Sequence, residues 1–478
     1  MNLLSCSPVS PLIIIEFIVT TTAFSTLSLA PAMLENLESL GYHTMTPIQA
    51  QSLPVILAGQ DIIAKAKTGS GKTAAFAIGL LDKLDVKQFS TQALVLCPTR
   101  ELADQVAKEI RRLARFTHNV KVLTLCGGVS IGPQLGSLER GAHIVVGTPG
   151  RIVDHLGKGS LSLQGLRQLV LDEADRMLEM GFSDALETVL QACPLQRQTL
   201  LFSATYPEAI KKISAHCQHD PVSVTVDSLH SNQHIEQHFY ELQDASQKQS
   251  AVLTLLAHYQ PQNSIVFCNT KQQCDEVSTD LRAAGISALA LHGDLEQRDR
   301  DQTLVRFANK SCSVLVATDV AARGLDIKDL DAVINIELSR DPEVHVHRIG
   351  RTGRAGETGL ALSLIAPNEV PRLNRLEDYV QQTLTLEHLP VTQQNPAELQ
   401  PQMVTLCIDG GRKDKLRPGD ILGALTKDAG LTGDNIGKID IFDFCAYVAV
   451  NTAVAKKALQ HLQQGKLKGR KFKARQVR

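Results

Sequence analysis

The chain is predicted to fold as two tandem α/β domains with parallel sheets, followed by a small α+β domain. Short apolar runs without polar alternation lie between helical segments, which is typical of parallel strands covered on both faces. The same alternation begins again after Asp227, and from Met403 the order changes to β-α-β-β-α-β. Because 478 residues are too many for one hydrophobic core, we expect separate domains.

The predicted strands of the first unit are residues 62–64, 93–97, 143–146, 169–171 and 199–202. Between them, Leu102, Val106, Ile110 and Leu113 recur at the spacing of a helix face. The strands expected in the second unit are residues 264–268, 288–291, 314–317, 332–336 and 360–365. In the third unit we expect strands at 403–408, 436–442, 444–450 and 471–477, and helices at 420–429 and 453–463.

The domain boundaries follow from these patterns. Residues 1–21 contain an apolar run that Glu16 interrupts and that no Lys or Arg precedes, which excludes a signal peptide and a membrane span. We expect them to be a non-native or disordered extension from an upstream start site. The two α/β domains are predicted at 22–227 and 228–380, a linker rich in Gln, Pro and Thr at 381–402, and the small domain at 403–478.

Composition points to a soluble globular protein, since 43% of residues are hydrophobic and 21% are charged. The ten cysteines include no C-x-x-C pair, so neither a zinc site nor a disulfide framework is indicated, and a reducing cytoplasm is expected. The net charge of −1 hides an asymmetry. Residues 403–478 hold 15 Lys and Arg against seven Asp and no Glu, whereas the preceding 402 residues hold 34 against 43 acids. A basic C-terminal domain that follows an acidic remainder of the chain predicts a polyanionic partner for that domain.

Residues 62–73 read IIAKAKTGSGKT, an apolar run followed by a glycine-containing loop and a helix-forming segment. This is the context of a phosphate-binding P-loop, in which backbone N–H groups and a helix N-terminus surround an anion. Ala66 stands where the motif usually has its first Gly. Lys72 is expected to reach the terminal phosphates, and the Thr73 hydroxyl to bind Mg²⁺. The nucleotide-binding candidates here are Thr68, Gly69, Ser70, Gly71, Lys72 and Thr73.

The predicted strand at 169–171 ends in Asp172-Glu173-Ala174-Asp175. A buried strand ending in two carboxylates, downstream of a P-loop, is where such ATPases hold their metal and activate water. Asp172 is therefore expected to bind Mg²⁺, and Glu173 to orient or deprotonate the attacking water.

With these motifs in this order, the chain resembles the DEAD-box RNA helicases from Phe24 to its C-terminus. The resemblance implies ATP and Mg²⁺ as cofactors. Phe24, Tyr42 and Gln49 match the adenine-reading segment, with Tyr42 stacking on the base and Gln49 contacting its edge. Ser203 and Thr205 match the motif that couples hydrolysis to RNA engagement, and Asp326 is expected near the ribose.

The same resemblance implies RNA contacts from both α/β domains. These loops offer N–H, hydroxyl and Arg donors, which suit phosphates and sugars rather than base edges. The core is therefore expected to ignore base sequence and to separate short duplexes locally, without processive movement. The implied residues are Pro98, Thr99, Arg100, Gly128, Thr148, Gly150, Arg151, Asn269, Arg300 and Thr318.

The run from His347 to Arg354 resembles the arginine-finger motif of the family. Arg351 and Arg354 are three residues apart and can point to one spot. There they would neutralise charge developing on the γ-phosphate, an effect of roughly 10³–10⁵ in rate in other nucleotide hydrolases. Since the P-loop lies in the other domain, hydrolysis would require the two domains to close, which RNA would promote.

The β-α-β-β-α-β order of the C-terminal domain resembles an RRM. Within the family, the bacterial DbpA type is resembled by Leu406-Cys407-Ile408-Asp409-Gly410-Gly411-Arg412-Lys413 and by Arg417-Pro418-Gly419-Asp420. That resemblance implies docking on large-subunit ribosomal RNA and pre-50S particles. Tyr447 occupies one stacking position of the RRM sheet, but Cys445 occupies the other, so we expect RNA to lie mainly against loops and basic segments. The RNA-contacting candidates are Arg412, Lys413, Lys415, Arg417, Tyr447, Lys466, Lys468, Arg470, Lys471 and Lys473.

The resulting hypothesis is a cytoplasmic, monomeric, RNA-dependent ATPase that unwinds short ribosomal RNA duplexes during large-subunit assembly and has no membrane partner. An ATP-dependent RNA clamp with negligible strand separation has the same motifs. A non-enzymatic RNA-binding protein is disfavoured because Lys72, Thr73, Asp172, Glu173, Arg351 and Arg354 are all present. A DNA helicase is a third alternative.

Overall fold

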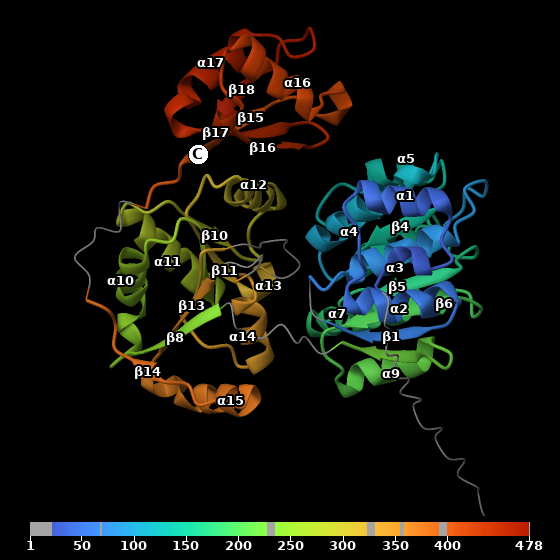
Figure 1. Cartoon of the computed structure of the whole chain (residues 1–478), viewed down its shortest axis with the longest axis horizontal. Coiled ribbons are helices and arrows are strands. Elements are labelled where there is room, and N and C mark those ends of the chain that lie inside the picture. The colour runs from blue at the N-terminus through green and yellow to red at the C-terminus, as the bar shows by residue number, and fades with distance from the viewer. Residues whose placement is uncertain are drawn as a thin grey trace, which may run out of the picture. The chain divides into compact units, whose positions relative to one another are not determined.

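The computed structural model describes residues 22–66, 69–226, 235–322, 330–353, 358–391 and 399–477. Its internal contacts divide the chain into two compact units. One contains the first α/β domain, and the other contains the second α/β domain together with the C-terminal domain (Figure 1). The predicted extension at 1–21 lies outside the described residues.

The first domain is a seven-stranded, all-parallel sheet with strand order β3-β4-β2-β5-β6-β1-β7. Its strands are β1 (Ile62–Lys65), β2 (Ala93–Leu96), β3 (Val122–Leu125), β4 (Ile144–Gly147), β5 (Gln168–Leu171), β6 (Gln198–Ser203) and β7 (Val222–Thr225). Its helices are α1 (Pro31–Ser39), α2 (Pro47–Leu57), α3 (Lys72–Asp82), α4 (Arg100–Leu113), α5 (Gly132–Leu138), α6 (Pro149–Gly157), α7 (Ala174–Glu179), α8 (Ser183–Ala192) and α9 (Glu208–Cys217).

Helices cover both faces of this sheet, and alternate residues of each strand enter opposite cores. In β5, Val170 packs in the core that α1 to α4 share, whereas Leu169 and Leu171 pack in the core under α6 to α9. Burial on both faces explains why the central strands are continuously apolar. The predicted parallel α/β fold is thus confirmed.

The second domain repeats this architecture, with parallel strand order β10-β11-β9-β12-β13-β8-β14. Its strands are β8 (Ile235–Glu241), β9 (Ser264–Cys268), β10 (Ala288–Leu291), β11 (Val314–Thr318), β12 (Ala332–Asn335), β13 (Gly359–Ile365) and β14 (Leu386–Glu387). Its helices are α10 (Lys248–Tyr259), α11 (Lys271–Ala283), α12 (Gln297–Ala308), α13 (Asp319–Ala322), α14 (Pro342–Ile349) and α15 (Val370–Val380).

Part of the segment predicted as a linker, 381–402, belongs to the second domain. Leu386 and Glu387 form β14 beside β8, and Leu389 and Leu399 pack against the domain core. The interpretation as a plain linker is therefore wrong for these residues, because their apolar side chains close one edge of the sheet and its core. Residues 392–398 lie outside the described ranges.

The C-terminal domain has the predicted β-α-β-β-α-β order and an antiparallel sheet ordered β16-β17-β15-β18. Its strands are β15 (Met403–Ile408), β16 (Ile436–Ile441), β17 (Ala446–Asn451) and β18 (Ala474–Gln476). Its helices are α16 (Pro418–Gly423), which continues as a π-helical turn over Ala424–Asp428, and α17 (Ala455–Gln464). β17 begins two residues later than predicted because residues 442–445 close a turn, in which the Phe442 N–H donates to the Cys445 carbonyl.

No helix within the described residues combines the length and the apolar character needed to cross a membrane.

Candidate nucleotide site and RNA-contacting surfaces

The predicted nucleotide-binding and RNA-contacting segments divide one edge of the first sheet between them. The P-loop follows β1, the Asp172–Asp175 segment follows β5, and Ala204 and Thr205 follow β6, which lies between β5 and β1. The RNA-contacting candidates follow β2, β4 and β3, which are neighbours in the other half. Because parallel strands end at the same edge, each set of loops converges at its own half of that edge.

The P-loop has the backbone that phosphate binding requires. Gly69 and Gly71 have φ values of +85° and +99°, a region that L side chains rarely adopt. A Cβ on Gly71 would lie 2.6 Å from the Gln49 Nε2 and 2.8 Å from the Thr46 Oγ1, so the close approach of helix α2 also requires glycine. The loop leads directly into α3, an 11-residue helix that begins at Lys72. Its N-terminus favours an anion. Thr68 lies outside the described residues.

Several polar atoms at this site are buried without a hydrogen-bond partner among the described residues. They include the Lys72 Nζ, the Asp172 Oδ1, the Ser70 Oγ and the Ser203 Oγ. Lys72 is 5% exposed and Asp172 is 2% exposed. Burial raises the pKa of Asp172 to about 7, although the Lys72 charge acts in the opposite direction. Buried groups of this kind are costly unless a ligand satisfies them. The donor set therefore fits the phosphates of a nucleotide and a magnesium ion.

Glu173 lies beside this group in an unusual backbone conformation. Its φ and ψ are +52° and +53°, and its side chain is 7% exposed. A non-glycine residue in the left-handed region is uncommon, and such strain concentrates at functional sites. The strained residue lies between the end of β5 and the start of α7.

Asp175 links this segment to the loop after β6. Its Oδ2 accepts hydrogen bonds from the backbone N–H groups of Ala204 and Thr205 at 3.1 and 2.9 Å, and from the Thr205 hydroxyl at 3.0 Å. Although burial opposes ionisation, these hydrogen bonds hold the pKa of Asp175 below its usual value. We did not predict Asp175 as a site residue. Two features of the sequence could have indicated it: Asp175 is the last residue of the Asp172–Asp175 motif, and a second motif, Ser203-Ala204-Thr205, occurs downstream.

Replacing Thr205 by Val is expected to destabilise the first domain by about 1–2 kcal/mol, because a buried carboxylate loses a charge-assisted hydrogen bond. The wild-type stabilisation is present above the unfolded-state pKa of Asp175 and is lost as pH falls through the lowered folded-state pKa. Thermal unfolding at pH 7 and at pH 3 measures both effects. Thr188→Val is the control, since the exposed Thr188 hydroxyl donates only within its own helix. Equal stability of both variants at pH 7 would contradict the role of Thr205.

The predicted adenine-reading residues lie next to the P-loop but are engaged within the protein. The Gln49 Oε1 accepts from the Thr46 N–H at 2.9 Å, and its Nε2 donates to the Gly71 carbonyl at 3.1 Å. The Tyr42 hydroxyl donates to Glu109, and the Arg112 guanidinium lies 5.2 Å from the Tyr42 ring centroid. Burial and this hydrogen bond raise the pKa of Tyr42 to about 12. Phe24 is buried and packs edge-on against Tyr42. Base recognition by Gln49 would therefore require its present hydrogen bonds to be exchanged.

The RNA-contacting candidates of the first domain form a connected set. Thr99 and Thr148 precede helices α4 and α6, and the Thr99 hydroxyl caps its helix. Arg100 lies so close to Gly128 that a Cβ on Gly128 would be 2.3 Å from an Arg100 nitrogen. Pro98 is buried, and Gly150 is exposed in the first turn of α6. The helix N-termini and Arg100 thus share the edge formed by β2, β4 and β3.

Arg151 differs from its predicted role as a direct contact. Its two terminal nitrogens donate to the Gln134 Oε1 and the Val129 carbonyl, both at 2.9 Å. Gln134 in turn donates to the Cys126 carbonyl. Arg151 therefore holds the loop around Gly128 in place, and in this structure its guanidinium is engaged within the protein.

In the second domain, Arg348 organises the predicted loops. It is 2% exposed and forms a bidentate ion pair with Asp319, at 2.6 and 2.7 Å. Its other bonds reach the Glu337 carbonyl at 2.7 Å and the Asn269 Oδ1 at 3.0 Å. The Asn269 amide also donates to Glu337. Asn269, predicted as an RNA contact, is thus engaged in an internal network in this structure, which fixes the ends of β9, β11 and β12.

The remaining predicted residues of this domain are placed as follows. Thr318 ends β11 and accepts from the Ala321 N–H at 3.4 Å, while Arg300 on α12 donates to the Ala321 carbonyl at 2.8 Å. Arg351 follows α14 by two residues and is half-buried. Arg354 and Asp326 lie outside the described residues.

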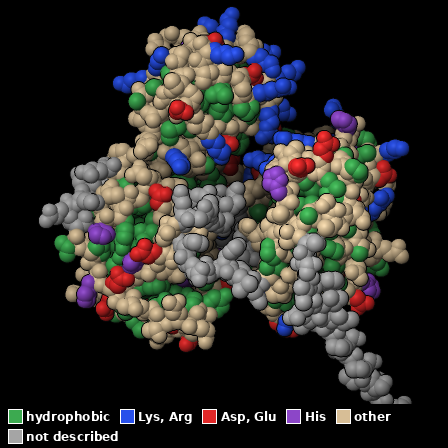
Figure 2. Space-filling model, viewed as in Figure 1, with side chains coloured by type: hydrophobic (Ala, Val, Ile, Leu, Met, Phe, Trp, Pro, Cys, Tyr) green, Lys and Arg blue, Asp and Glu red, His purple; other side chains and the backbone are tan. Residues whose placement is uncertain are grey.

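The two basic segments of the C-terminal domain meet in space. Lys468 donates to the Lys415 carbonyl at 3.0 Å although the residues are 53 positions apart in sequence. Arg412 is exposed and donates to the Ile441 carbonyl. Lys and Arg side chains gather over this domain in Figure 2. The other members of the surface are also exposed: Lys413, Lys415, Arg417, Lys466, Lys468, Arg470, Lys471 and Lys473.

The prediction that Tyr447 contacts RNA does not agree with the structure. Tyr447 is 7% exposed, and it packs with Phe442 and Cys407 of its own domain and with Val305 of α12. Its ring meets that of Phe442 edge-on, with the centroids 5.6 Å apart. The stacking position is therefore covered by protein in this structure.

Comparison with known proteins agrees with this geometry. Residues 46–213 match the DEAD/DEAH box helicase family, and residues 247–356 match the helicase conserved C-terminal domain. Residues 405–476 match the DbpA RNA binding domain. The chain belongs to the DEAD-box ATP-dependent RNA helicases.

Two curated relatives show how far the similarity extends. The chain is 59% identical to the ATP-dependent RNA helicase DbpA of Escherichia coli over 455 residues, which cover 95% of this chain and 99% of the relative. It is 43% identical over 358 residues to the DEAD-box ATP-dependent RNA helicase CshA of Geobacillus kaustophilus, covering 74% and 76% of the two chains. The similarity to the Escherichia coli protein, which covers 95% of this chain, includes the C-terminal domain.

Among solved structures, the chain resembles S. cerevisiae Dbp5 bound to RNA and ADP BeF3. The TM-score is 0.70 at 29% identity, and the similarity covers 77% of this chain and 96% of that one. The two-domain helicase core is thus shared with a protein solved with both a nucleotide and RNA.

Proposed function

We propose that this helicase locally separates short ribosomal RNA duplexes in a pre-50S particle and that its C-terminal domain directs it to large-subunit ribosomal RNA. The observation that carries the proposal is the basic surface whose two segments meet at Lys468 and Lys415, on a domain that matches the DbpA RNA binding domain. A net charge of +8 over residues 403–478 supports binding to a polyanion.

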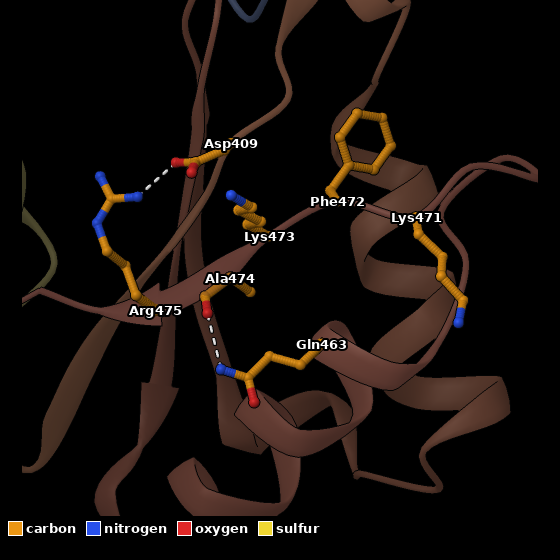
Figure 3. A pocket seen from close by; sticks show the side chains of 7 residues that line it. All are labelled: Asp409, Gln463, Lys471, Phe472, Lys473, Ala474 and Arg475. Carbon is orange, nitrogen blue, oxygen red and sulfur yellow. Dashed lines mark hydrogen bonds and ion pairs between the residues drawn. The ribbon is translucent and has the colours of Figure 1, made fainter.

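A groove beside the edge strand β18 suits an RNA strand. It has a volume of about 510 Å³, within the range of nucleotide-sized ligand sites. In Figure 3, Asp409 and Arg475 point toward one another and form an ion pair, while Gln463 reaches from α17 to the Ala474 carbonyl at 2.9 Å. Lysines provide phosphate donors, and the half-buried Phe472 supplies an apolar wall. The lining residues are Asp409, Gln463, Lys471, Phe472, Lys473, Ala474 and Arg475.

For the catalytic cycle, we propose that Lys72, Thr73 and Asp172 hold the triphosphate and Mg²⁺, with Glu173 orienting the attacking water. The buried, unpartnered Lys72 Nζ and Asp172 Oδ1 support this assignment. The metal would neutralise phosphate charge when bound. Arg351 and Arg354 are proposed to complete the site from the second domain, with Asp326 near the ribose. Ser203 and Thr205 are proposed to couple hydrolysis to RNA engagement, and Thr205 is linked to the Asp172–Asp175 segment through its hydrogen bonds to Asp175.

We also propose that the protein acts as a monomer in the cytoplasm. The nine cysteines among the described residues are all free thiols, and burial raises the pKa of several, including Cys126 and Cys217, to about 12. Buried thiols without disulfides are compatible with a reducing compartment.

The steady-state ATPase rate tests this function when measured without RNA, with total ribosomal RNA and with an unrelated RNA of matched length. The expected result is a large stimulation by ribosomal RNA alone. Equal stimulation by both RNAs would contradict the proposed targeting, and no stimulation by either would favour the alternative of a non-enzymatic RNA-binding protein. Strand release with ATP and with a non-hydrolysable analogue separates a helicase from an RNA clamp.

Replacing both Lys471 and Lys473 by Ala is expected to weaken ribosomal RNA binding by about tenfold or more at 0.1 M salt, because two phosphate contacts are lost. The slope of log K against log salt should fall by about 2. Filter binding across a salt series measures both quantities. The control is the double variant Lys456→Ala, Lys457→Ala, which removes the same charge from exposed positions on α17 outside the groove. If both double variants weakened RNA binding equally, the groove would contribute only general electrostatic attraction and not a specific RNA site.

A further inference from the structure

The C-terminal sheet buries both of its faces. Leu406, Ile408 and Val448 point into the domain core under α16 and α17. On the opposite face, Cys407 and Tyr447 pack with Val305 of α12 in the second helicase domain. These three residues are 0%, 7% and 6% exposed. An RRM usually binds RNA on this face. Because a helix of the same chain covers the face here, it must have another role in this protein.

Hydrogen bonds close the same contact. The Thr405 hydroxyl on β15, 1% exposed, meets the Asn309 Nδ2 at 3.2 Å and the Ser311 Oγ at 2.7 Å. Asn309 and Ser311 follow α12 directly and are 3% and 7% exposed. Nearby, the Ser313 Oγ donates to the Leu399 carbonyl at 3.3 Å. Buried polar groups that satisfy one another across a contact specify a single arrangement.

The other end of α12 leads toward the predicted arginine finger. In its first turn, Arg300 donates to the Ala321 carbonyl of α13 at 2.8 Å. The first residue of α13 is Asp319, which forms the bidentate ion pair with Arg348. Arg348 is the next-to-last residue of α14 and lies three residues before Arg351. One helix thus contacts the C-terminal sheet near its end and, in its first turn, contacts α13, the short helix whose first residue pairs with Arg348.

We propose that the sheet face of the C-terminal domain is a docking surface for α12, and that this docking couples RNA held on the basic surface to the position of the Arg351 segment. Thr405, Cys407 and Tyr447 form the docking surface, and Val305 is the α12 residue that packs against it. Val305 and Thr405 are positioning residues, because they act through α12 rather than on RNA or nucleotide. The inference rests on the proposed targeting of ribosomal RNA by this domain.

The test compares Val305→Asp with Ala308→Asp in the full chain. Val305→Asp places a charge in the buried contact, whereas Ala308→Asp places the same charge on an exposed position of the same helix. For Val305→Asp we expect a ribosomal RNA Kd within about twofold of wild type and an RNA-stimulated kcat at least tenfold lower. Ala308→Asp should match wild type in both. A structural role alone would not separate kcat from RNA affinity in this way.

Hydrogen exchange on the full chain checks the docking independently of activity. Amides of β15 and β17 near Thr405 and Tyr447 should exchange faster in Val305→Asp than in Ala308→Asp. Amides of α16, which packs on the opposite face of the sheet, should exchange at the same rate in both variants. If Val305→Asp fails to fold, Thr405→Val is used, which removes both hydroxyl contacts and keeps the side-chain shape. A two- to fivefold loss of kcat at unchanged Kd is then expected.

Two outcomes overturn the inference. A wild-type kcat in the folded variant would show that docking does not affect the Arg351 segment. A loss of RNA affinity without a loss of kcat would show that the sheet face binds RNA instead. Both leave the proposed function intact, because that function fails only if the wild-type ATPase does not respond selectively to ribosomal RNA.

Discussion

Replacing Glu173 by Gln is expected to lower the RNA-stimulated kcat by at least 10³-fold and to leave ATP affinity within about threefold of wild type. The amide is nearly isosteric with the carboxylate, so the strained turn at φ +52° and the neighbouring Asp172 should keep their positions. The variant would lose the group that we propose orients and deprotonates the attacking water, and acid–base catalysis combined with positioning contributes an effect of this general size. Single-turnover hydrolysis and equilibrium titration with a fluorescent ATP analogue measure the two quantities separately.

The control for this variant is Glu187→Gln on α8, an exposed position in the same domain. It removes the same charge and should leave kcat unchanged. If the Glu173→Gln enzyme retained its kcat, Glu173 would not be the base. If the variant lost ATP binding, Glu173 would instead contribute to binding the nucleotide.

Replacing Arg348 by Lys is expected to destabilise the second helicase domain by about 3–5 kcal/mol. A buried ammonium cannot form the bidentate pair with the partly exposed Asp319, and it leaves the Glu337 carbonyl and the Asn269 Oδ1 without their donor. The guanidinium also lies 5.1 Å from the Phe267 ring centroid, a contact that a lysine side chain would not reproduce in the same geometry. Hydrogen exchange of β9, β11 and β12 in the full chain measures the local stability, and ATPase measurements should show a large loss of RNA stimulation.

Arg375→Lys provides the comparison, since Arg375 is exposed on α15 and its Nε donates to the Pro371 carbonyl of the same helix. It should change stability by less than about 0.5 kcal/mol. Equal protection in the two variants would mean that the Arg348 network contributes little to the domain.

The places of the candidate nucleotide-site segments in the fold could be predicted because the residues of each segment are contiguous. The P-loop and the Asp172–Asp175 segment each combine a buried strand with a turn, and a parallel sheet necessarily brings such turns to one edge. The central strands were predicted for a related reason, since burial on both faces makes them continuously apolar. β3, β7 and β8 were not predicted, because they have partly exposed residues and lack that uniform pattern.

The contacts between distant segments could not be predicted from local patterns. Nothing near Arg348 in the sequence indicates Asn269 or Asp319 as its partners, which lie 79 and 29 positions away. Arg151 and Asn269 carry the residue types of RNA contacts, yet here they bind the protein itself. Tyr447 failed as an RNA contact for a similar reason, because the RRM pattern shows which face it occupies but not that α12 covers that face.

The division of the first sheet has a pharmacological consequence. The loops after β1, β5 and β6 and those after β2, β4 and β3 occupy separate halves of one edge, with β5 next to β2 at the border. A small molecule bound near Arg100 and Gly128 would touch none of the P-loop residues, so inhibition there should be non-competitive with ATP. Resistance substitutions at such a site would also leave the nucleotide pocket, which resembles that of many other ATPases, unchanged. The half of the edge that carries the candidate RNA contacts is therefore the better place to seek selective inhibitors of this enzyme.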